Sequence, residues 1–171
     1  MKKMLGLVAS LTAISAVCAG VLAYVNEITK DPIKATAAAN EQKAIMAVMP
    51  KGVEKVEPVG EAFAGKDASG KVVGYAAKGM DSGGYGGDIV LMVGFKADKK
   101  TLVSYKVLSA SETPGLGMKL SAPEFSGQFV GKNGSSLKVK KDGGEIEAIT
   151  SATITSRAVC RAISNANSKL K

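Results

Sequence analysis

The sequence predicts an α+β protein, in which a single-span N-terminal membrane helix precedes a domain with a mostly antiparallel sheet flanked by helices. Three observations support this class. An uncharged apolar run of 22 residues extends from Met4 to Val25. Short apolar segments follow between residues 53 and 108, and the last residues carry apolar side chains at helical spacing. We expect a transmembrane anchor over 1–25, a helical stalk over 26–50 and one domain over 51–171.

The run Met4 to Val25 is long enough, as a helix, to cross the roughly 30 Å hydrocarbon core of a bilayer. A cleaved signal peptide is the alternative, although its apolar core is usually only about 7 to 15 residues long. Lipid attachment at Cys18 is a further alternative, which the bulky preceding Val17 disfavours. Charge orients the helix only weakly, because two lysines precede it and two follow it: Lys2, Lys3, Lys30 and Lys34.

Helices and strands after the anchor are expected from local signals. A helix from Pro32 to Met49 would continue the stalk, since Pro suits a first helical turn and Pro50 follows its end. Pro123 to Gly131 is expected to be irregular. Turn residues, among them Ala97 to Lys100, separate the expected strands. These strands are Val53 to Val56, Lys71 to Ala77, Ile89 to Phe95, Leu102 to Leu108 and an edge strand at Leu137 to Lys140.

A terminal amphipathic helix is predicted with Ser156 as its N-cap. Its apolar side chains recur at helical spacing: Val159, Ile163, Ala166 and Leu170. The preceding segment is rich in Ser and Thr, and a helix N-terminus favours an anion by roughly 0.3 to 1 kcal/mol for an exposed charge. Arg157 would strengthen that preference. An ordinary capped helix is the structural alternative, because Ser and Thr hydroxyls cap helices in many proteins.

Composition limits the chemistry that this chain can perform. The formal net charge of +8 comes from scattered lysines, without Trp and without aromatic residues interleaved with arginines, so nucleic-acid binding is not expected. The chain has no His and two cysteines, Cys18 and Cys160, one in the anchor and one in the terminal helix. No disulfide framework and no metal, haem or iron–sulfur site built from this chain alone is expected. A redox centre would have to be an organic cofactor.

Two motifs resemble those of a known family, the FMN-binding domains of redox-driven ion pumps. Thr150-Ser151-Ala152-Thr153 is similar to the Ser/Thr-Gly-Ala-Thr flavinylation motif of that family. Glu112-Thr113-Pro114-Gly115-Leu116-Gly117, by itself a Pro–Gly turn, resembles letter for letter the loop that lines the isoalloxazine pocket in the G subunit of the Rnf complex and the C subunit of the sodium-pumping quinone reductase. Gly83-Gly84-Tyr85-Gly86-Gly87-Asp88 is similar to a third family segment, but such a run is more often a flexible turn.

The resemblance implies FMN bound covalently, through a phosphodiester to Thr153 Oγ that a separate flavin transferase installs. Thr is a weak nucleophile without an adjacent base, and a chain without His fits chemistry supplied by another protein. The implied phosphate or ribityl contacts are Thr150, Ser151, Ala152, Thr155 and Ser156. The implied ring contacts are Glu112, Thr113, Pro114, Gly115, Leu116, Gly117 and Lys119, with Tyr85 as a pocket wall. No catalytic residue and no metal ligand is implied.

At the level of function, the resemblance implies a membrane-anchored electron-transfer subunit of an Rnf-type ion-translocating ferredoxin:NAD oxidoreductase complex. Its partners would be the other subunits, the transferase and the membrane. The anchor would lie in the cytoplasmic membrane, with the domain on the extracytoplasmic side. One alternative is the C subunit of the quinone reductase, which is a longer chain. The other is a non-redox anchored module that binds a small anionic ligand or serves as a scaffold.

The chain departs from the family pattern at two positions. Ser151 stands where Gly is usual, and a left-handed backbone there would cost about 1 to 2 kcal/mol. Glu147 stands where relatives commonly have Asp, six residues before Thr153. We therefore expect weaker recognition by the transferase and incomplete modification.

Overall fold

The computed structural model describes residues 2–170, with side chains from residue 3. The chain forms two units, divided between Asn40 and Glu41. Helix α1 (Lys2–Val48) runs without a break through Pro32. The expectation that a helix starts near Pro32 is therefore wrong; alanines, which are strong helix formers, follow the proline and offset its missing N–H group.

The apolar part of α1 has the length and hydropathy of a membrane span, and within residues 2–170 it is the one helix that does. Its large apolar side chains are exposed, with Leu5, Leu11 and Leu22 each about 70% accessible. Water disfavours so long an exposed apolar surface, whereas lipid accommodates it. The structure thus agrees with a single candidate span near the N-terminus.

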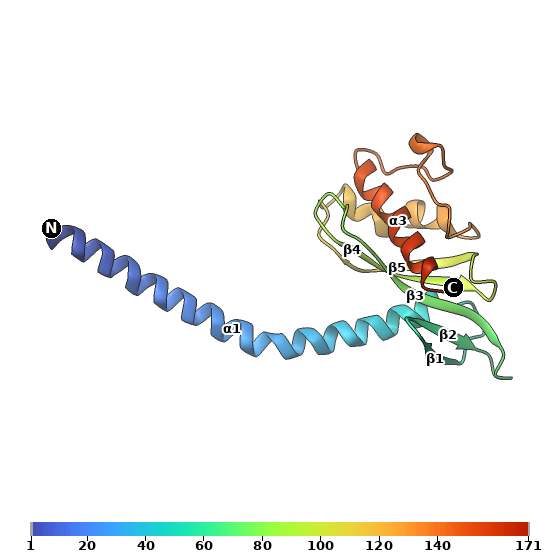
Figure 1. Ribbon diagram of the computed structural model, residues 1–171, viewed down its shortest axis with the longest axis horizontal. Helices are drawn as coiled ribbons and strands as arrows, with labels where there is room; N and C mark the ends of the chain where they lie inside the picture. The colour runs from blue at the N-terminus through green and yellow to red at the C-terminus, as the bar shows by residue number, and fades with distance from the viewer. Residues whose placement is uncertain (1, 171) are drawn as a thin grey trace. The chain divides into compact units, whose positions relative to one another are not determined.

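The second unit contains one five-stranded antiparallel sheet in the order β1-β2-β3-β4-β5, so each strand pairs with its neighbours in the sequence (Figure 1). The strands are β1 (Lys55–Val59), β2 (Ala62–Lys66), β3 (Val72–Asp81), β4 (Ile89–Lys96) and β5 (Leu102–Ala110). The predicted α+β class with an antiparallel sheet is confirmed.

Two hydrophobic clusters cover the two faces of this sheet. On β4, Leu91 and Val93 belong to the larger cluster, whereas Met92 between them belongs to the smaller one. Because successive strand residues point to opposite faces, the clusters lie on opposite sides. Helix α3 (Thr153–Ser168) supplies the larger cluster, and the end of α1 from Ala44 supplies the smaller one.

Glycines allow both helices to approach the sheet closely. A Cβ atom at Gly79 on β3 would lie against the carbonyl oxygen of Ala162 on α3, far inside van der Waals contact. A Cβ atom at Gly94 on β4 would lie equally close to the carbonyl oxygen of Val48. Backbone therefore packs directly on backbone at these two points, and side chains larger than hydrogen would force the helices outward.

An ion pair adds to the attachment of α3. Arg161 Nε and Nη2 donate to the two carboxylate oxygens of Asp81 at 2.9 and 2.7 Å, and the Asp81 side chain is only 13% exposed. The bidentate contact joins the third turn of α3 to the end of β3.

The segment between β5 and α3 has little regular structure. It contains α2 (Pro123–Ser126) and three 3-10 helices: η1 (Gly117–Ser121), η2 (Gly127–Phe129) and η3 (Lys140–Asp142). Tyr105, Phe125 and Phe129 pack edge to face beneath it, with ring centroids 5.3 to 5.5 Å apart. The expectation that Pro123 to Gly131 is irregular is wrong, because α2 and η2 occupy most of this segment and the aromatic rings hold it to the core.

The strand expected at Leu137 to Lys140 is wrong. Val139 makes one isolated bridge to Ile146, and a 3-10 turn follows at once. Side chains of this segment alternate between buried and exposed because some of them enter the core, although no strand pairs with the segment. Strand β2 was not predicted, because its sequence Ala-Phe-Ala-Gly-Lys lacks β-branched residues; pairing with β1 and β3 on both sides creates it.

We predict that Gly79→Ala lowers the free energy of unfolding by about 1 to 3 kcal/mol, the range for overpacked cores. Urea denaturation of the full chain in detergent measures this. Gly127→Ala is the matched control, since a Cβ atom there has no neighbour within 4 Å and φ is −63°. Equal losses in the two variants would contradict the close approach of α3 to β3.

We also predict that the Asp81–Arg161 pair makes stability depend on acid pH. The Arg161 guanidinium holds the pKa of the Asp81 carboxyl below its usual 3.8. The stabilisation is therefore present above the unfolded-state pKa and is lost as pH falls through the folded-state pKa.

Asp81→Asn should accordingly be less stable at neutral pH and lose less stability below about pH 5 than the unsubstituted protein. Thermal unfolding across a pH series checks this. Asp142→Asn serves as the control, because the Asp142 side chain is 35% exposed against 13% for Asp81 and exposed pairs stabilise little. Parallel pH profiles for Asp81→Asn and the unsubstituted chain would exclude the role given to this pair.

Candidate functional site

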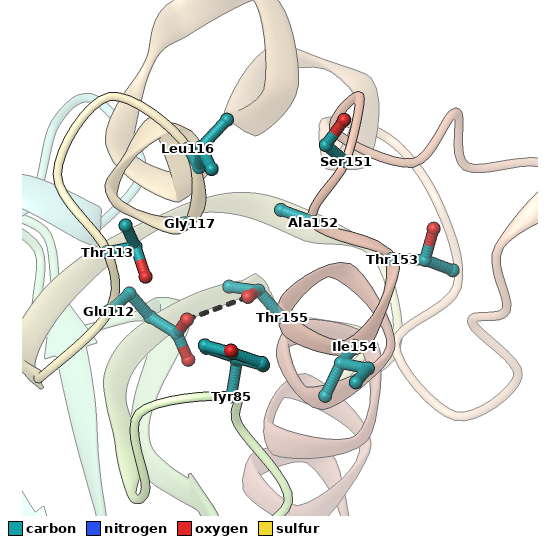
Figure 2. A pocket seen from close by; sticks show the side chains of 10 residues that line it. All are labelled: Tyr85, Glu112, Thr113, Leu116, Gly117, Ser151, Ala152, Thr153, Ile154 and Thr155. Carbon is teal, nitrogen blue, oxygen red and sulfur yellow. Dashed lines mark hydrogen bonds between the residues drawn. The ribbon is translucent and has the colours of Figure 1, made fainter.

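An open pocket of about 490 Å³ lies between three segments that are far apart in the sequence. They are the Gly-rich turn between β3 and β4, the segment directly after β5, and the start of α3 (Figure 2). The lining residues are Tyr85, Glu112, Thr113, Leu116, Gly117, Ser151, Ala152, Thr153, Ile154 and Thr155. The structure therefore brings residues of all three sequence motifs to one place.

Glu112 links these segments from inside the pocket. Its side chain is only 5% exposed. Thr155 Oγ1 donates a hydrogen bond of 2.8 Å to Glu112 Oε2 across 43 positions of sequence (Figure 2), and the Gly86 N–H donates a longer one of 3.4 Å to Glu112 Oε1. A buried carboxylate needs such donors, because its desolvation is costly.

Glycines make room for the Glu112 carboxylate. A Cβ atom at Gly84 would lie 2.7 Å from Glu112 Oε1, and one at Gly117 would lie 2.5 Å from Oε2. At Gly86 it would meet the carbonyl oxygen of Ser111. Both motifs therefore need glycine for the same reason. Their backbones contact the segment that contains Glu112 so closely that no side chain fits between them.

The Pro–Gly turn expected from the sequence is confirmed. Gly115 adopts φ +75°, and the Leu116 N–H donates to the Thr113 carbonyl oxygen at 3.2 Å, as in a type II turn with Pro114 at its first corner. The turn places Leu116, which is 42% exposed, on the side of the pocket opposite Ser151 and Thr153 (Figure 2).

The start of α3 differs from the expected one. The helix begins at Thr153, and its N-cap is Ala152, which offers no side-chain hydrogen bond. Ser156 is fully buried: its Oγ donates to the Ala152 carbonyl oxygen and accepts from the Ile149 N–H, both at 2.9 Å. The assignment of Ser156 as N-cap is therefore wrong, and its hydroxyl braces the preceding loop instead of facing the pocket.

Thr153 is half-buried and lies at the rim of the pocket. In Figure 2 its side chain stands beyond Ala152, across the pocket from Thr113 and Leu116. Because no side chain caps the helix, the first N–H groups of α3 remain available to an anion beside Thr153.

Several predicted site residues lie elsewhere. Lys119 and Thr150 line a second hollow of about 490 Å³, together with Glu147 and Phe125. Pro114 and Gly115 are exposed at the tip of their turn and do not belong to the lining of the first pocket.

Two further side chains of α3, Arg157 and Cys160, do not line the pocket. Arg157 forms a bidentate pair with Asp142 at 2.7 and 2.6 Å, so its charge is compensated away from the helix mouth. Cys160 lines a third hollow beside Arg157, and burial raises the pKa of its thiol to about 12. This thiol stays protonated at neutral pH and is a poor nucleophile.

One lining residue was not predicted, Ile154, which is 49% exposed. Its position on α3 lies nine residues before Ile163, about 180° around the helix axis from the buried face. The sequence signal that could have identified Ile154 is an apolar side chain on the helix side opposite the buried face. With Tyr85 and Leu116, both also exposed, it forms apolar walls around the pocket.

The residues present fit a flavin mononucleotide. The volume lies within the roughly 300 to 1,000 Å³ of small-molecule sites. Apolar side chains at the mouth suit a flat ring, and the uncapped N-terminus of α3 suits a phosphate. A hydroxyl at the pocket rim, that of Thr153, lies beside these amides.

Comparison with known families defines the class of protein. Residues 84–168 match the FMN-binding domain family, and all ten lining residues of the pocket lie within this range, so FMN is the cofactor class of the domain. Residues 1–48 match the RnfG N-terminal region.

Individual relatives define the family more narrowly. The chain is 33% identical to the G subunit of the ion-translocating oxidoreductase complex of Methanosarcina acetivorans, over 96% of this chain and 93% of that protein. It is 34% identical to the G subunit of the Na(+)-translocating ferredoxin:NAD(+) oxidoreductase complex of Acetobacterium woodii, over 91% and 84%. The chain belongs to the RnfG family, the G subunits of ion-translocating oxidoreductase complexes.

Solved structures support the fold. NqrC of Shewanella oneidensis superposes with a TM-score of 0.51 at 22% identity, covering 71% of this chain and 66% of that one. The C subunit of the Na(+)-translocating NADH-quinone reductase of Parabacteroides distasonis superposes with a TM-score of 0.52 at 27% identity, covering 61% and 57%.

Ser151 adopts φ +63°, a left-handed conformation that favours glycine. We predict that Ser151→Gly raises the free energy of unfolding by up to about 1 kcal/mol. Relief of roughly 1 to 2 kcal/mol of strain is partly offset by the entropy that glycine adds to the unfolded chain. Ser126→Gly, at φ −64°, should instead lower it by about 0.5 to 1 kcal/mol. Urea denaturation measures both; a loss in Ser151→Gly would contradict the strain.

Proposed function

We propose that this protein is the electron-transfer subunit of an Rnf-type ion-translocating ferredoxin:NAD oxidoreductase complex, with FMN bound covalently to Thr153. The observation that carries this proposal is the shared pocket: Thr153, the acidic turn and the Gly-rich turn line one cavity, and the family is RnfG. Ferredoxin and NAD would be substrates of the whole complex, and the flavin of this chain would relay electrons between its other carriers.

The bound flavin would supply the redox chemistry, and this chain would position it. Thr153 Oγ would form the phosphodiester, and the free N–H groups at the start of α3 would bind the phosphate oxygens. Tyr85, Leu116 and Ile154 would cover the ring from the outside. Thr155 would act indirectly, because its hydroxyl is already bonded to Glu112.

Attachment of the flavin would need a separate transferase. Thr153 has no histidine nearby to activate its hydroxyl, since the chain contains none. The segment before it is accessible at Glu147, Thr150 and Ser151, although Gln128 holds the backbone of Glu147 on both its N–H and its carbonyl. Glu in place of Asp at this position would slow recognition, so incomplete modification is part of the proposal.

The proposed arrangement in the cell follows from the candidate span. Residues 1–25 would anchor the protein in the cytoplasmic membrane, 26–50 would form the stalk, and 51–171 would be the FMN-binding domain on the extracytoplasmic side. Its partners would be the other subunits of the complex. The alternative is the function of the C subunit of the quinone reductase, whose fold is similar. The sequence identity to the G subunits favours the first function, because it extends over most of the chain.

The proposal predicts flavin fluorescence in a denaturing gel for the full chain purified from its native host or produced with a flavin transferase. Thr153→Val should abolish the fluorescent band and the added mass of FMN, because it removes the only atom proposed to form the bond. Thr36→Val is the matched control, an exposed threonine on α1 outside the residues that match the FMN-binding domain, and should stay fluorescent.

Three outcomes decide against parts of the proposal. Fluorescence that survives in Thr153→Val places the bond elsewhere. Flavin that copurifies but leaves on denaturation indicates a dissociable cofactor. A chain that carries no flavin under either condition indicates a non-redox module.

A further inference from the structure

The charge inside the pocket has a consequence for the bound cofactor. Among the ten lining residues, Glu112 is the one acidic or basic side chain. Within residues 3–170, no lysine or arginine lies within ion-pair distance of it, although eight other pairs form. Its two hydrogen bonds come from uncharged donors, Thr155 and Gly86. The pocket therefore contains a buried carboxylate without a counter-ion.

Such a charge acts strongly on its neighbours. Burial of Glu112 to 5% exposure keeps water from screening it, and an effective dielectric constant below that of water lengthens its reach. The two arginines of α3 are each paired with another carboxylate, Arg157 with Asp142 and Arg161 with Asp81.

We propose that the Glu112 carboxylate lowers the reduction potential of the flavin in this pocket. This inference rests on the proposed function. The oxidised isoalloxazine ring is neutral; on accepting two electrons and one proton from a donor it becomes an anion. A fixed negative charge in the same pocket opposes that new charge and favours the oxidised form. Glu112 thus acts as an electrostatic residue that sets the driving force of electron transfer.

The geometry keeps this effect constant. Thr155 Oγ1 holds one carboxylate oxygen, and the backbones at Gly84 and Gly117 leave the side chain no space to turn away. The flavin would be tethered at Thr153, two residues before Thr155. The first turn of α3 would therefore hold both groups, the flavin through a covalent bond and the Glu112 carboxylate through a hydrogen bond.

The test uses the full chain loaded with covalent flavin, titrated with dithionite in the presence of redox dyes while the flavin absorbance is recorded. In Glu112→Gln, which removes the charge at nearly constant shape, the ratio of reduced to oxidised flavin at a fixed potential should rise at least tenfold. That corresponds to a midpoint at least about 30 mV higher for a two-electron couple.

Two control variants separate charge from structure. Glu124→Gln removes the same charge from the second hollow and should change the ratio less than threefold. Glu112→Asp keeps the charge but shortens the reach to Thr155, so it should lower the thermal midpoint while the flavin ratio stays within threefold. A purely structural role would move the potential in Glu112→Asp and Glu112→Gln together.

An unchanged or lower midpoint in Glu112→Gln overturns the inference, as does an equal shift in Glu112→Asp. If Glu112→Gln fails to fold, redox-difference infrared spectra of the unsubstituted protein labelled with ¹³C-glutamate decide: a carboxylate band that shifts on reduction supports the inference, and its absence overturns it. An unsubstituted chain without covalent flavin would instead refute the proposed function, so the two failures are distinguishable.

Discussion

The hydrogen bond from Thr155 to Glu112 is the contact on which the site depends. It joins the first turn of α3 to the segment that leaves β5, and so it closes the pocket between elements that are remote in the sequence. A buried carboxylate is stable only with such donors. The bond also explains the glycines around it: Gly84 and Gly117 leave the volume that the carboxylate occupies.

The position of α3 over the sheet is set by a different constraint, the contact of backbone with backbone at Gly79. Side chains of the larger cluster hold the helix against β3 and β4, and the Asp81–Arg161 pair connects the end of β3 to it. As a result the N-terminus of α3 lies beside the pocket, where residues Ser151 to Thr155 line it. The core thereby places Thr153 and the uncapped start of α3, whose N–H groups suit an anion, at the same rim of the pocket.

Prediction from the sequence succeeded where the physical signal is local. Apolar runs define β3, β4 and β5, and Pro114 with Gly115 defines a turn, because backbone preferences act over a few residues. Prediction failed where strand pairing or side-chain packing determines the conformation. Strand β2 forms because it pairs with β1 and β3, whereas no strand pairs with Leu137 to Lys140. Ser156 is buried because its hydroxyl bonds to the backbone of the loop that precedes α3.

By itself, the sequence determined the apolar N-terminal span, the α+β class and the three motifs, since each of these depends on residue type and short spacing. It also identified Ser151 as an unusual residue, but only the folded backbone shows φ +63° there. Tertiary structure alone decided that the motifs share one pocket, that Lys119 and Thr150 lie outside it, and that the buried Glu112 pairs with no lysine or arginine of residues 3–170. These properties depend on contacts between residues tens of positions apart, which local preferences do not encode.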